Sequence, residues 1–155
     1  MKAALRPATH DDLSAIASLQ RAAAQEAFAH IGPVERLSTG PETWAPALDS
    51  ADTALVAEHD GEVVGFAFRR GCELSVFYTH PRVWGRGFGR ALLEAIEEAM
   101  RESSCEEGIV YTEERNHRPL RIYTLAGWEP DGAARERDWL DVPIREIRLV
   151  KPLRE

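Results

Sequence analysis

The sequence predicts one α+β domain over residues 1–155, built on a mixed, mostly antiparallel sheet of about seven strands flanked by about four helices. Three observations predict this class. The periodic segments follow in the order strand, two helices, three strands, helix, strand, helix and two strands. An Asp60-Gly61 pair between two apolar runs indicates a tight hairpin between antiparallel strands. A strand–helix–strand–helix unit then makes the sheet mixed.

The first third of the chain predicts a short strand and then helices. "AALRPA" has the pattern of an opening strand. Thr9 is in position to cap a helix that begins at His10, with Asp12 three residues further on in a capping-box arrangement and apolar periodicity to about Phe28. Residues 31–50 contain three prolines and two glycines, and short helical pieces are expected at 34–37 and 43–48.

The rest of the chain predicts two further helices and six strands. A helix is expected from Gly87 to Glu102, because its apolar residues fall on one face and its charges on the other. A second helix is expected from Asn116 to Ala126, ended by Gly127 as a C-cap. The expected strands are the two arms of the hairpin within "TALVAEHDGEVVGFAFRR", then "ELSVFYT", "GIVYT", and two closing strands near 128–137 and 144–150.

Net charge and composition argue against a nucleic-acid-binding, membrane-spanning or secreted protein. The net charge is −7, so we expect no nucleic-acid partner, and a cationic small molecule or peptide would suit the surface better. No apolar run reaches the roughly 20 residues of a membrane span. The N-terminus turns polar after five residues and does not resemble a secretory leader. We therefore expect a cytoplasmic protein with no membrane partner.

Cysteine and histidine spacing gives no metal signature. Cys72 and Cys105 show no C-x-x-C pattern, and we interpret both as reduced thiols. The five histidines are scattered, with no pair at a metal-ligating helical spacing, so no metal is expected.

The most informative stretch is "HPRVWGRGFGRALLEAIEE", in which three alternating glycines lead directly into a helix. A helix start presents unpaired N–H groups and a positive dipole end, and glycine lets a phosphate approach the backbone without meeting a Cβ. From His80 to Arg90 there are three arginines and no acid. This pattern favours a diphosphate ligand. A Walker loop is excluded because the stretch has no lysine, and a dinucleotide fingerprint is excluded because Arg90 stands at its third glycine position.

"THPRVWGRGFGRALLEAIEE" resembles the acetyl-CoA-binding motif R/Q-x-x-G-x-G/A of the GNAT N-acetyltransferase superfamily. Gly87 and Gly89 fill its two small positions, while Trp84 stands where the family has Arg or Gln. A second segment, "NHRPLRIYTLAGWEPDG", resembles the family's N-x-x-A-x-x-F-Y-x-x-x-G-F, with Asn116 and Tyr123 in place. The resemblance covers nearly the whole chain and implies a GNAT-like fold.

The resemblance also implies a binding site for acetyl-CoA as co-substrate. The strand Glu73–Thr79 would bulge near its end and splay from its neighbour, so that the backbone of Phe77 and Thr79 binds the pantetheine arm and polarises the thioester. Asn116 would bind the arm near its thiol end or brace the following helix. The pyrophosphate would lie on the loop residues Gly85, Arg86, Gly87, Phe88, Gly89 and Arg90.

Two catalytic roles follow from the same resemblance. Tyr123 would protonate the departing thiolate, although a tyrosine packed into the core would look the same. Glu73 lies eleven residues before Trp84, the spacing of the base glutamate in some histone-acetylating members; otherwise it is an exposed residue after a turn. Glu113 and Glu114 are alternative bases.

The acceptor is less defined. Specificity would come from residues 28–48 and the final hairpin. Glu35 could attract an ammonium group, and Trp44 could stack on it or instead be a core aromatic. Trp128 and Trp139 are expected to pack in the core, and a nucleophilic Cys105 is not expected.

The leading hypothesis is an N-acetyltransferase that moves an acetyl group from acetyl-CoA to a primary amine of a small molecule or peptide by direct attack in a ternary complex. An alternative is a non-catalytic acyl-CoA-binding sensor or interaction module with the same fold. A third hypothesis is an acyltransferase whose acyl donor is a longer CoA thioester. A homodimer could form through exposed strand edges.

Overall fold

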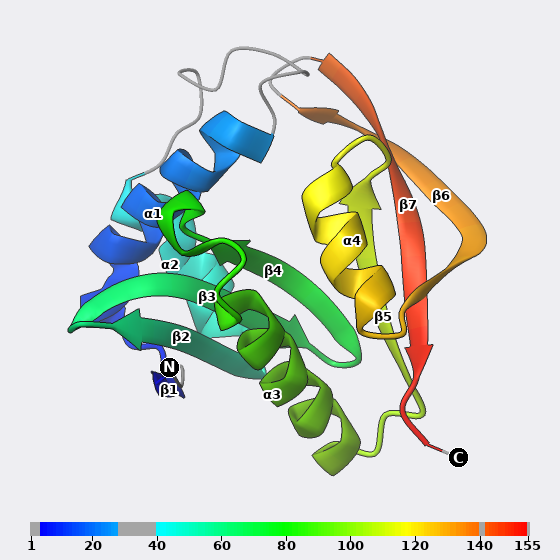
Figure 1. The fold of residues 1–155 in the computed structure, drawn as a ribbon, viewed down its shortest axis with the longest axis horizontal. Helices are drawn as coiled ribbons and strands as arrows, with labels where there is room; N and C mark the ends of the chain where they lie inside the picture. The colour runs from blue at the N-terminus through cyan, green and yellow to red at the C-terminus, as the bar shows by residue number, and fades with distance from the viewer. Residues whose placement is uncertain (1–3, 28–39, 140–141, 155) are drawn as a thin grey trace.

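A seven-stranded sheet runs through the molecule in the order β1-β2-β3-β4-β5-β7-β6 (Figure 1). The computed structural model describes residues 4–27, 40–139 and 142–154. All neighbouring strands pair antiparallel except β4 and β5, which are parallel. The strands are β1 (Ala4–Pro7), β2 (Thr53–His59), β3 (Glu62–Arg70), β4 (Glu73–Thr79), β5 (Glu107–Glu113), β6 (Glu129–Trp139) and β7 (Val142–Pro152).

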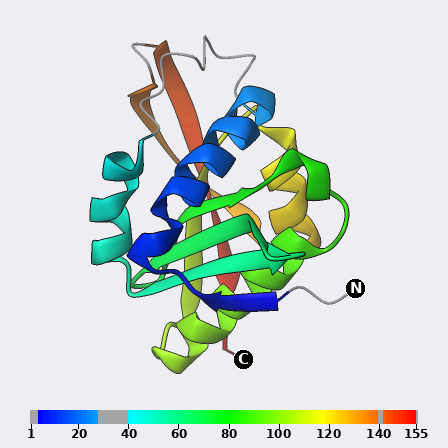
Figure 2. The same cartoon turned by 90° about the vertical axis from the view of Figure 1, so that its left-hand side faces the viewer.

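The α-helices of the described chain cover both faces of this sheet, and Figure 2 shows α2 and α4 on opposite sides of it. None of them is long and apolar enough to cross a membrane. The order of strands and helices agrees with the predicted order, which confirms the α+β class. The helices are α1 (Leu13–Ala27), α2 (Pro41–Ser50), α3 (Phe88–Glu102) and α4 (His117–Leu125), with 3₁₀ turns η1 (His10–Asp12) and η3 (Pro81–Val83). The piece expected at 34–37 lies outside the described residues.

Two hydrophobic cores hold the helices in place. On one face α1 and α2 pack against Phe66, Phe68 and Val56 of the sheet. On the other face the apolar stripe of α3 packs with α4 and with the fully buried Trp128. The indole Nε1 of Trp128 donates to Glu97 Oε2 at 3.2 Å, which confirms its predicted packing role.

The two halves of the sheet part between β4 and β5. These strands pair at two positions, Glu73 with Ile109 and Leu74 with Val110, and then diverge, as the different directions of β2–β4 and β5–β7 show in Figure 1. Ser75 is an extra residue opposite β3, and its Oγ donates to the carbonyl of Phe68 at 3.1 Å. The bulge was expected near the end of β4, but it lies near its start, where the twist it adds helps to open the sheet.

The predicted turn chemistry is present. Asp60 and Gly61 both have positive φ, 53° and 79°, as the two-residue hairpin between β2 and β3 requires. Gly127 follows α4 with φ 95°, so a glycine ends this helix as predicted.

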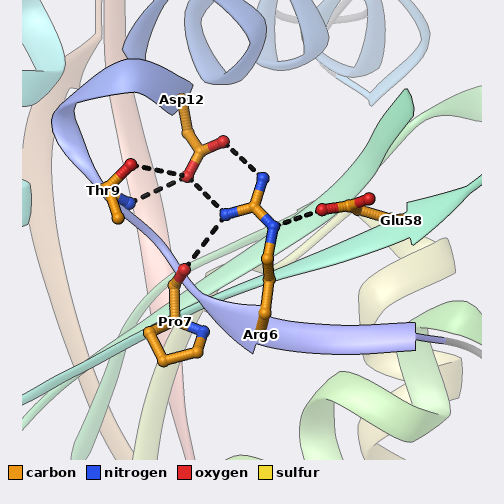
Figure 3. A network of polar contacts seen from close by, with 5 residues as sticks. All are labelled: Arg6, Pro7, Thr9, Asp12 and Glu58. Atoms are coloured by element: carbon orange, nitrogen blue, oxygen red, sulfur yellow. Dashed lines mark hydrogen bonds and ion pairs between the residues drawn. The ribbon is translucent and has the colours of Figure 1, made fainter. Parts of the chain in front are cut away.

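The start of α1 is tied to the sheet by a polar network around Arg6 (Figure 3). The carboxylate of Asp12 accepts two hydrogen bonds from the Arg6 guanidinium, at 2.8 and 2.7 Å, and one from the N–H of Thr9 at 2.8 Å. Glu58 on β2 binds the Nε of the same arginine. The bond from Arg6 lowers the pKa of Asp12, so this carboxylate stays ionised well into acid.

Cys72 and Cys105 form a disulfide, so the expectation of two reduced thiols is wrong. The two residues are 33 apart in sequence, and their spacing alone gives no sign that they meet. Cys72 lies immediately before β4 and Cys105 shortly before β5, so the bond joins the starts of the two strands that later diverge. The amide of Ile109 also donates to the carbonyl of Cys72 at 2.9 Å at this closed end.

We predict that Asp12→Asn lowers the free energy of unfolding by roughly 1–2 kcal/mol at pH 7, because a capping interaction and a partly buried ion pair are lost. A depressed carboxyl pKa stabilises the fold above the unfolded pKa, and this contribution disappears as the pH falls through the folded pKa. Urea unfolding should therefore show the two proteins converging in acid. Asp11→Asn, on the exposed neighbour, is the control, and an equal effect at both positions would contradict the assignment.

We predict that the double variant Cys72→Ala/Cys105→Ala loses about 3–4 kcal/mol of stability, since a cross-link over a loop of this length restricts the unfolded chain. Chemical denaturation of oxidised wild type, reduced wild type and the variant measures this loss. Detection of two free thiols per chain in protein purified without reductant would refute the disulfide.

Candidate active site

A cleft runs through the sheet where β4 and β5 diverge. One cavity of about 580 Å³ lies between these strands and is lined by residues from helices on both faces of the sheet, and a second of about 590 Å³ lies between the glycine loop and α4. The residues that line both cavities are Thr79, Trp84, His117, Arg118 and Ile122. The glycine loop, the open edge of β4 and the start of α4 therefore form one continuous site.

The glycine loop turns the chain into α3. Gly85 and Gly87 have φ 78° and 90°, in the left-handed region that favours glycine, and Gly87 is the N-cap of α3. Within the described chain no acceptor is found for the main-chain N–H groups of Gly87, Phe88, Gly89 and Arg90. These groups converge at the positive end of a 15-residue helix, which is the geometry that binds phosphate.

Gly89 keeps the passage open for such a group. A Cβ built on Gly89 would lie 3.4 Å from the ring of Phe77, 3.6 Å from Ile122 and 3.7 Å from Thr79. One methyl fits at these distances, but a larger side chain would fill the gap between β4 and α4. The residues present therefore fit a diphosphate carried on an extended arm.

The open edge of β4 exposes main-chain groups to the cleft. His80 N–H bonds to Val64 of β3, so by antiparallel alternation Tyr78 faces β3, while Phe77 and Thr79 direct N–H and C=O groups toward the gap. The carbonyl of Thr79 accepts from Trp84 Nε1 at 3.1 Å.

The loop arginines make contacts within the protein. Arg86 lies 3.4 Å from the Nε2 of His59 and does not line either cavity. Arg90 lines the second cavity and pairs with Glu94 at 2.9 Å.

Asn116 and Tyr123 lie on α4 and line the first cavity. Asn116 is the buried N-cap of the helix, and its backbone N–H donates to the carbonyl of Glu113 at 3.0 Å. Tyr123 is 3% exposed, packs 5.9 Å from Phe77 and 6.1 Å from Trp128, and its hydroxyl has no hydrogen bond within the described chain. Burial raises the pKa of the Tyr123 phenol, so this group is protonated at neutral pH.

The three candidate bases differ in their surroundings. Glu73 lines the first cavity at the closed end and has no ion-pair partner among the described residues. Glu113 also lines it, but its buried carboxylate accepts from the backbone N–H and the Nε of Arg115, at 2.8 and 3.1 Å. Glu114 does not line the cavity and pairs with Arg145 at 3.5 Å.

The face of the cleft toward α1 and α2 is aromatic. Trp44 packs edge-on against Phe66 at 5.5 Å, as expected of a core aromatic, and also lines the first cavity. Its stacking on an ammonium group stays a prediction. Its Nε1 is buried without an acceptor in the described part of the chain. Tyr78 lies 6.5 Å from Trp44, and burial raises the pKa of its phenol. Glu35 lies outside the described residues, as does the side chain of Trp139.

The sequence interpretation missed a charged cluster on β6 and β7. Arg135 Nε donates to the buried carboxylate of Glu146 at 2.8 Å, and Arg137 forms an ion pair with the same oxygen, with its Nε 3.2 Å away. All three residues line the first cavity. Arg135 also stacks on Tyr111, with its guanidinium 3.8 Å from the ring centroid. The alternation of Arg135 and Arg137 on one strand face was the available signal.

The cleft does not share the acidic balance of the whole chain. Four carboxylates and four guanidinium groups line the first cavity among the described residues: Glu26, Glu73, Glu113, Glu146, Arg115, Arg118, Arg135 and Arg137. In the same part of the chain, no group of three or more His, Cys, Asp or Glu residues is arranged to hold a metal.

The sequence matches the acetyltransferase (GNAT) family over residues 13–128. The chain belongs to this family. It is 28% identical over 110 residues to an L-methionine sulfoximine/L-methionine sulfone acetyltransferase of Salmonella typhimurium, an alignment that covers 61% of this chain and 64% of that protein. The L-amino acid N-acyltransferase MnaT of Escherichia coli is also 28% identical over 110 residues, 61% of this chain and 63% of its own length.

Solved structures of the GNAT type share the fold. The paiA N-acetyltransferase of Thermoplasma acidophilum, in complex with coenzyme A, superposes with a TM-score of 0.76 at 19% identity, covering 98% of this chain and 99% of that one. YncA of Salmonella typhimurium, with acetyl-CoA, has a TM-score of 0.75 at 20% identity, covering 100% and 96%. These likenesses establish the GNAT fold predicted from the two motifs.

We predict a graded loss of coenzyme A binding at Gly89. Gly89→Ala should bind within about threefold of wild type, because its methyl meets ordinary contact distances, whereas Gly89→Val should lose tenfold or more (about 1.4 kcal/mol per tenfold). Isothermal titration measures affinity, and thermal melts check that both variants fold. Equal affinity of the valine variant and wild type would show that the ligand does not pass this residue.

Proposed function

We propose that the protein transfers an acetyl group from acetyl-CoA to a primary amine by direct attack in a ternary complex. The observation that supports this most is the cleft between β4 and β5, which is lined by α1 and α2 on one face of the sheet and by α4 on the other. A thioester entering along the glycine loop and α4 could meet an amine entering beside α1 and α2. Both substrates would then be bound together, and no covalent enzyme intermediate is required.

The donor would be held mainly by main-chain groups. The unpaired N–H groups at the start of α3 would receive the diphosphate, and the open edge of β4 at Phe77 and Thr79 would bind the amides of the arm. Because the carbonyl of Thr79 already accepts from Trp84, the edge groups left for the arm are the N–H of Thr79 and both groups of Phe77. A donor N–H aimed at the thioester oxygen would stabilise the charge that develops there.

Tyr123 and Glu73 would move the protons. The amine nitrogen attacks the carbonyl carbon, the C–S bond breaks, and Tyr123 gives its phenolic proton to the departing sulfur. The surplus proton of the attacking nitrogen passes to Glu73, directly or through one water, and both residues return to their starting states by exchange with solvent. Glu73 is favoured over Glu113, because the carboxylate of Glu113 is buried and already bound to Arg115, whereas Glu73 has no ion-pair partner among the described residues.

The acceptor class we propose is an amine that also carries a carboxylate, such as an amino acid or a peptide end. Arg135 and Arg137 share the single carboxylate of Glu146, which leaves a surplus positive charge at that end of the cavity. Arginine binds carboxylates well through its remaining N–H groups. The Escherichia relative is named an L-amino acid N-acyltransferase, and the Salmonella relative is named for L-methionine sulfoximine and L-methionine sulfone, which agrees with this class.

We predict that Tyr123→Phe lowers kcat roughly 10²-fold or more while coenzyme A affinity changes little, because the proton donor is lost but the ring packing stays. Because the phenol pKa is raised, kcat of wild type should show no loss from Tyr123 ionisation between about pH 6 and 9. Stopped assays of thiol release against an amine panel measure both. Unchanged kcat in the variant would remove Tyr123 from the mechanism, and coenzyme A binding without any turnover would favour the sensor hypothesis.

We predict that Arg137→Ala raises KM about tenfold or more for acceptors with a carboxylate and much less for the matching amines or amides, since one charged hydrogen bond is lost. Arg154→Ala, at the exposed C-terminal end, is the matched control. An equal rise in KM for both kinds of acceptor would show that Arg137 does not recognise the carboxylate.

A further inference from the structure

The glycine loop begins with Trp84, which carries no charge. Trp84 stands where the family usually has Arg or Gln, and its one donor, Nε1, is bonded to the carbonyl of Thr79 at 3.1 Å. Of the neighbouring arginines, Arg82 pairs with Glu62 and Arg90 with Glu94, while Arg86 lies beside His59 and lines neither cavity. A diphosphate on this loop would meet backbone N–H groups but little uncommitted positive charge from the loop itself.

Arg118 of α4 lies opposite the loop and has this charge available. Its guanidinium carbon is 4.0 Å from the centroid of the Trp84 ring, and it has no carboxylate partner among the described residues. Both residues line the cavity between the glycine loop and α4 as well as the cavity between β4 and β5. Trp84 and Arg118 therefore lie where the two cavities join.

The stacking arrangement suits phosphate binding. A guanidinium held over an aromatic face is oriented by its flat surface, while the N–H groups in its plane remain free to donate. Trp84 is itself fixed by its bond to the end of β4, so the arginine is held at a defined place in the cleft rather than on a mobile side chain.

We propose that Trp84 positions Arg118 as a side-chain cation for the diphosphate of the donor, so that α4 supplies positive charge that position 84 of the loop does not. The proposal rests on the proposed function, in that the cleft binds coenzyme A. It goes beyond that function in two ways. The positive charge that binds the diphosphate comes from α4, and Trp84 acts as a positioning residue. The bound ligand would then link the glycine loop to α4 across the cleft.

The first test is the affinity of wild type and Arg118→Ala for coenzyme A and for dephospho-coenzyme A, measured by isothermal titration at several salt concentrations. Arg118→Ala should weaken both ligands by about 10- to 100-fold, the range of one or two charge-assisted hydrogen bonds, and should reduce the salt dependence of binding. Arg118→Lys should restore part of the affinity, and the Arg154→Ala control should bind like wild type.

The second test is a double-mutant cycle with Trp84→Arg, which puts the family's usual residue back into the loop. In that background Arg118→Ala should cost less than threefold, because position 84 now supplies the cation.

The outcomes separate the two proposals. Wild type that fails to bind coenzyme A contradicts the proposed function itself. Wild-type binding with an Arg118→Ala variant within twofold of it overturns the role of Arg118 and leaves the function standing. A loss for coenzyme A but not for its dephospho form would move Arg118 to the 3′-phosphate and also overturn the proposal. An Arg118→Ala effect that is undiminished in the Trp84→Arg background refutes the positioning role of Trp84.

Discussion

The parting of β4 from β5 is the constraint on which the site depends. Two parallel strands that begin side by side keep two residue pairs and then separate, so one sheet edge becomes available inside the molecule. Buried main-chain groups need partners, and unpaired ones are costly in a protein interior. An open edge in the middle of a sheet therefore calls for a ligand that can supply hydrogen bonds along its length, as the amides of a pantetheine arm can.

Several contacts join β4 and β5 at the closed end of the gap, where the two strands begin. The Cys72–Cys105 disulfide, the short β4–β5 ladder and the bond from Ile109 to Cys72 all lie where the two strands begin. The extra residue at Ser75 then turns β4 away from its neighbour. The positions of Phe77 and Thr79 relative to α4 follow from this closed end and the bulge.

The charge balance around the central cavity differs from the net charge of the whole chain. The protein carries a net charge of −7, which favoured a cationic acceptor, but the described lining of the central cavity is balanced between guanidinium groups and carboxylates. At the glycine-loop end, Arg82 and Arg90 pair with carboxylates, and Arg118 of α4 stacks on Trp84.

The sequence by itself determined the order of the elements, the Asp60-Gly61 hairpin, the cap at Asp12 and the glycine loop before α3, because each depends on neighbours within a few residues. The likeness of two motifs to the GNAT superfamily then predicted the fold and the region of the site. Only the tertiary structure decided which side chains meet. The disulfide, the arginine pair around Glu146 and the contact of Arg118 with Trp84 join residues of different elements, and these contacts exist only once the sheet has formed and opened.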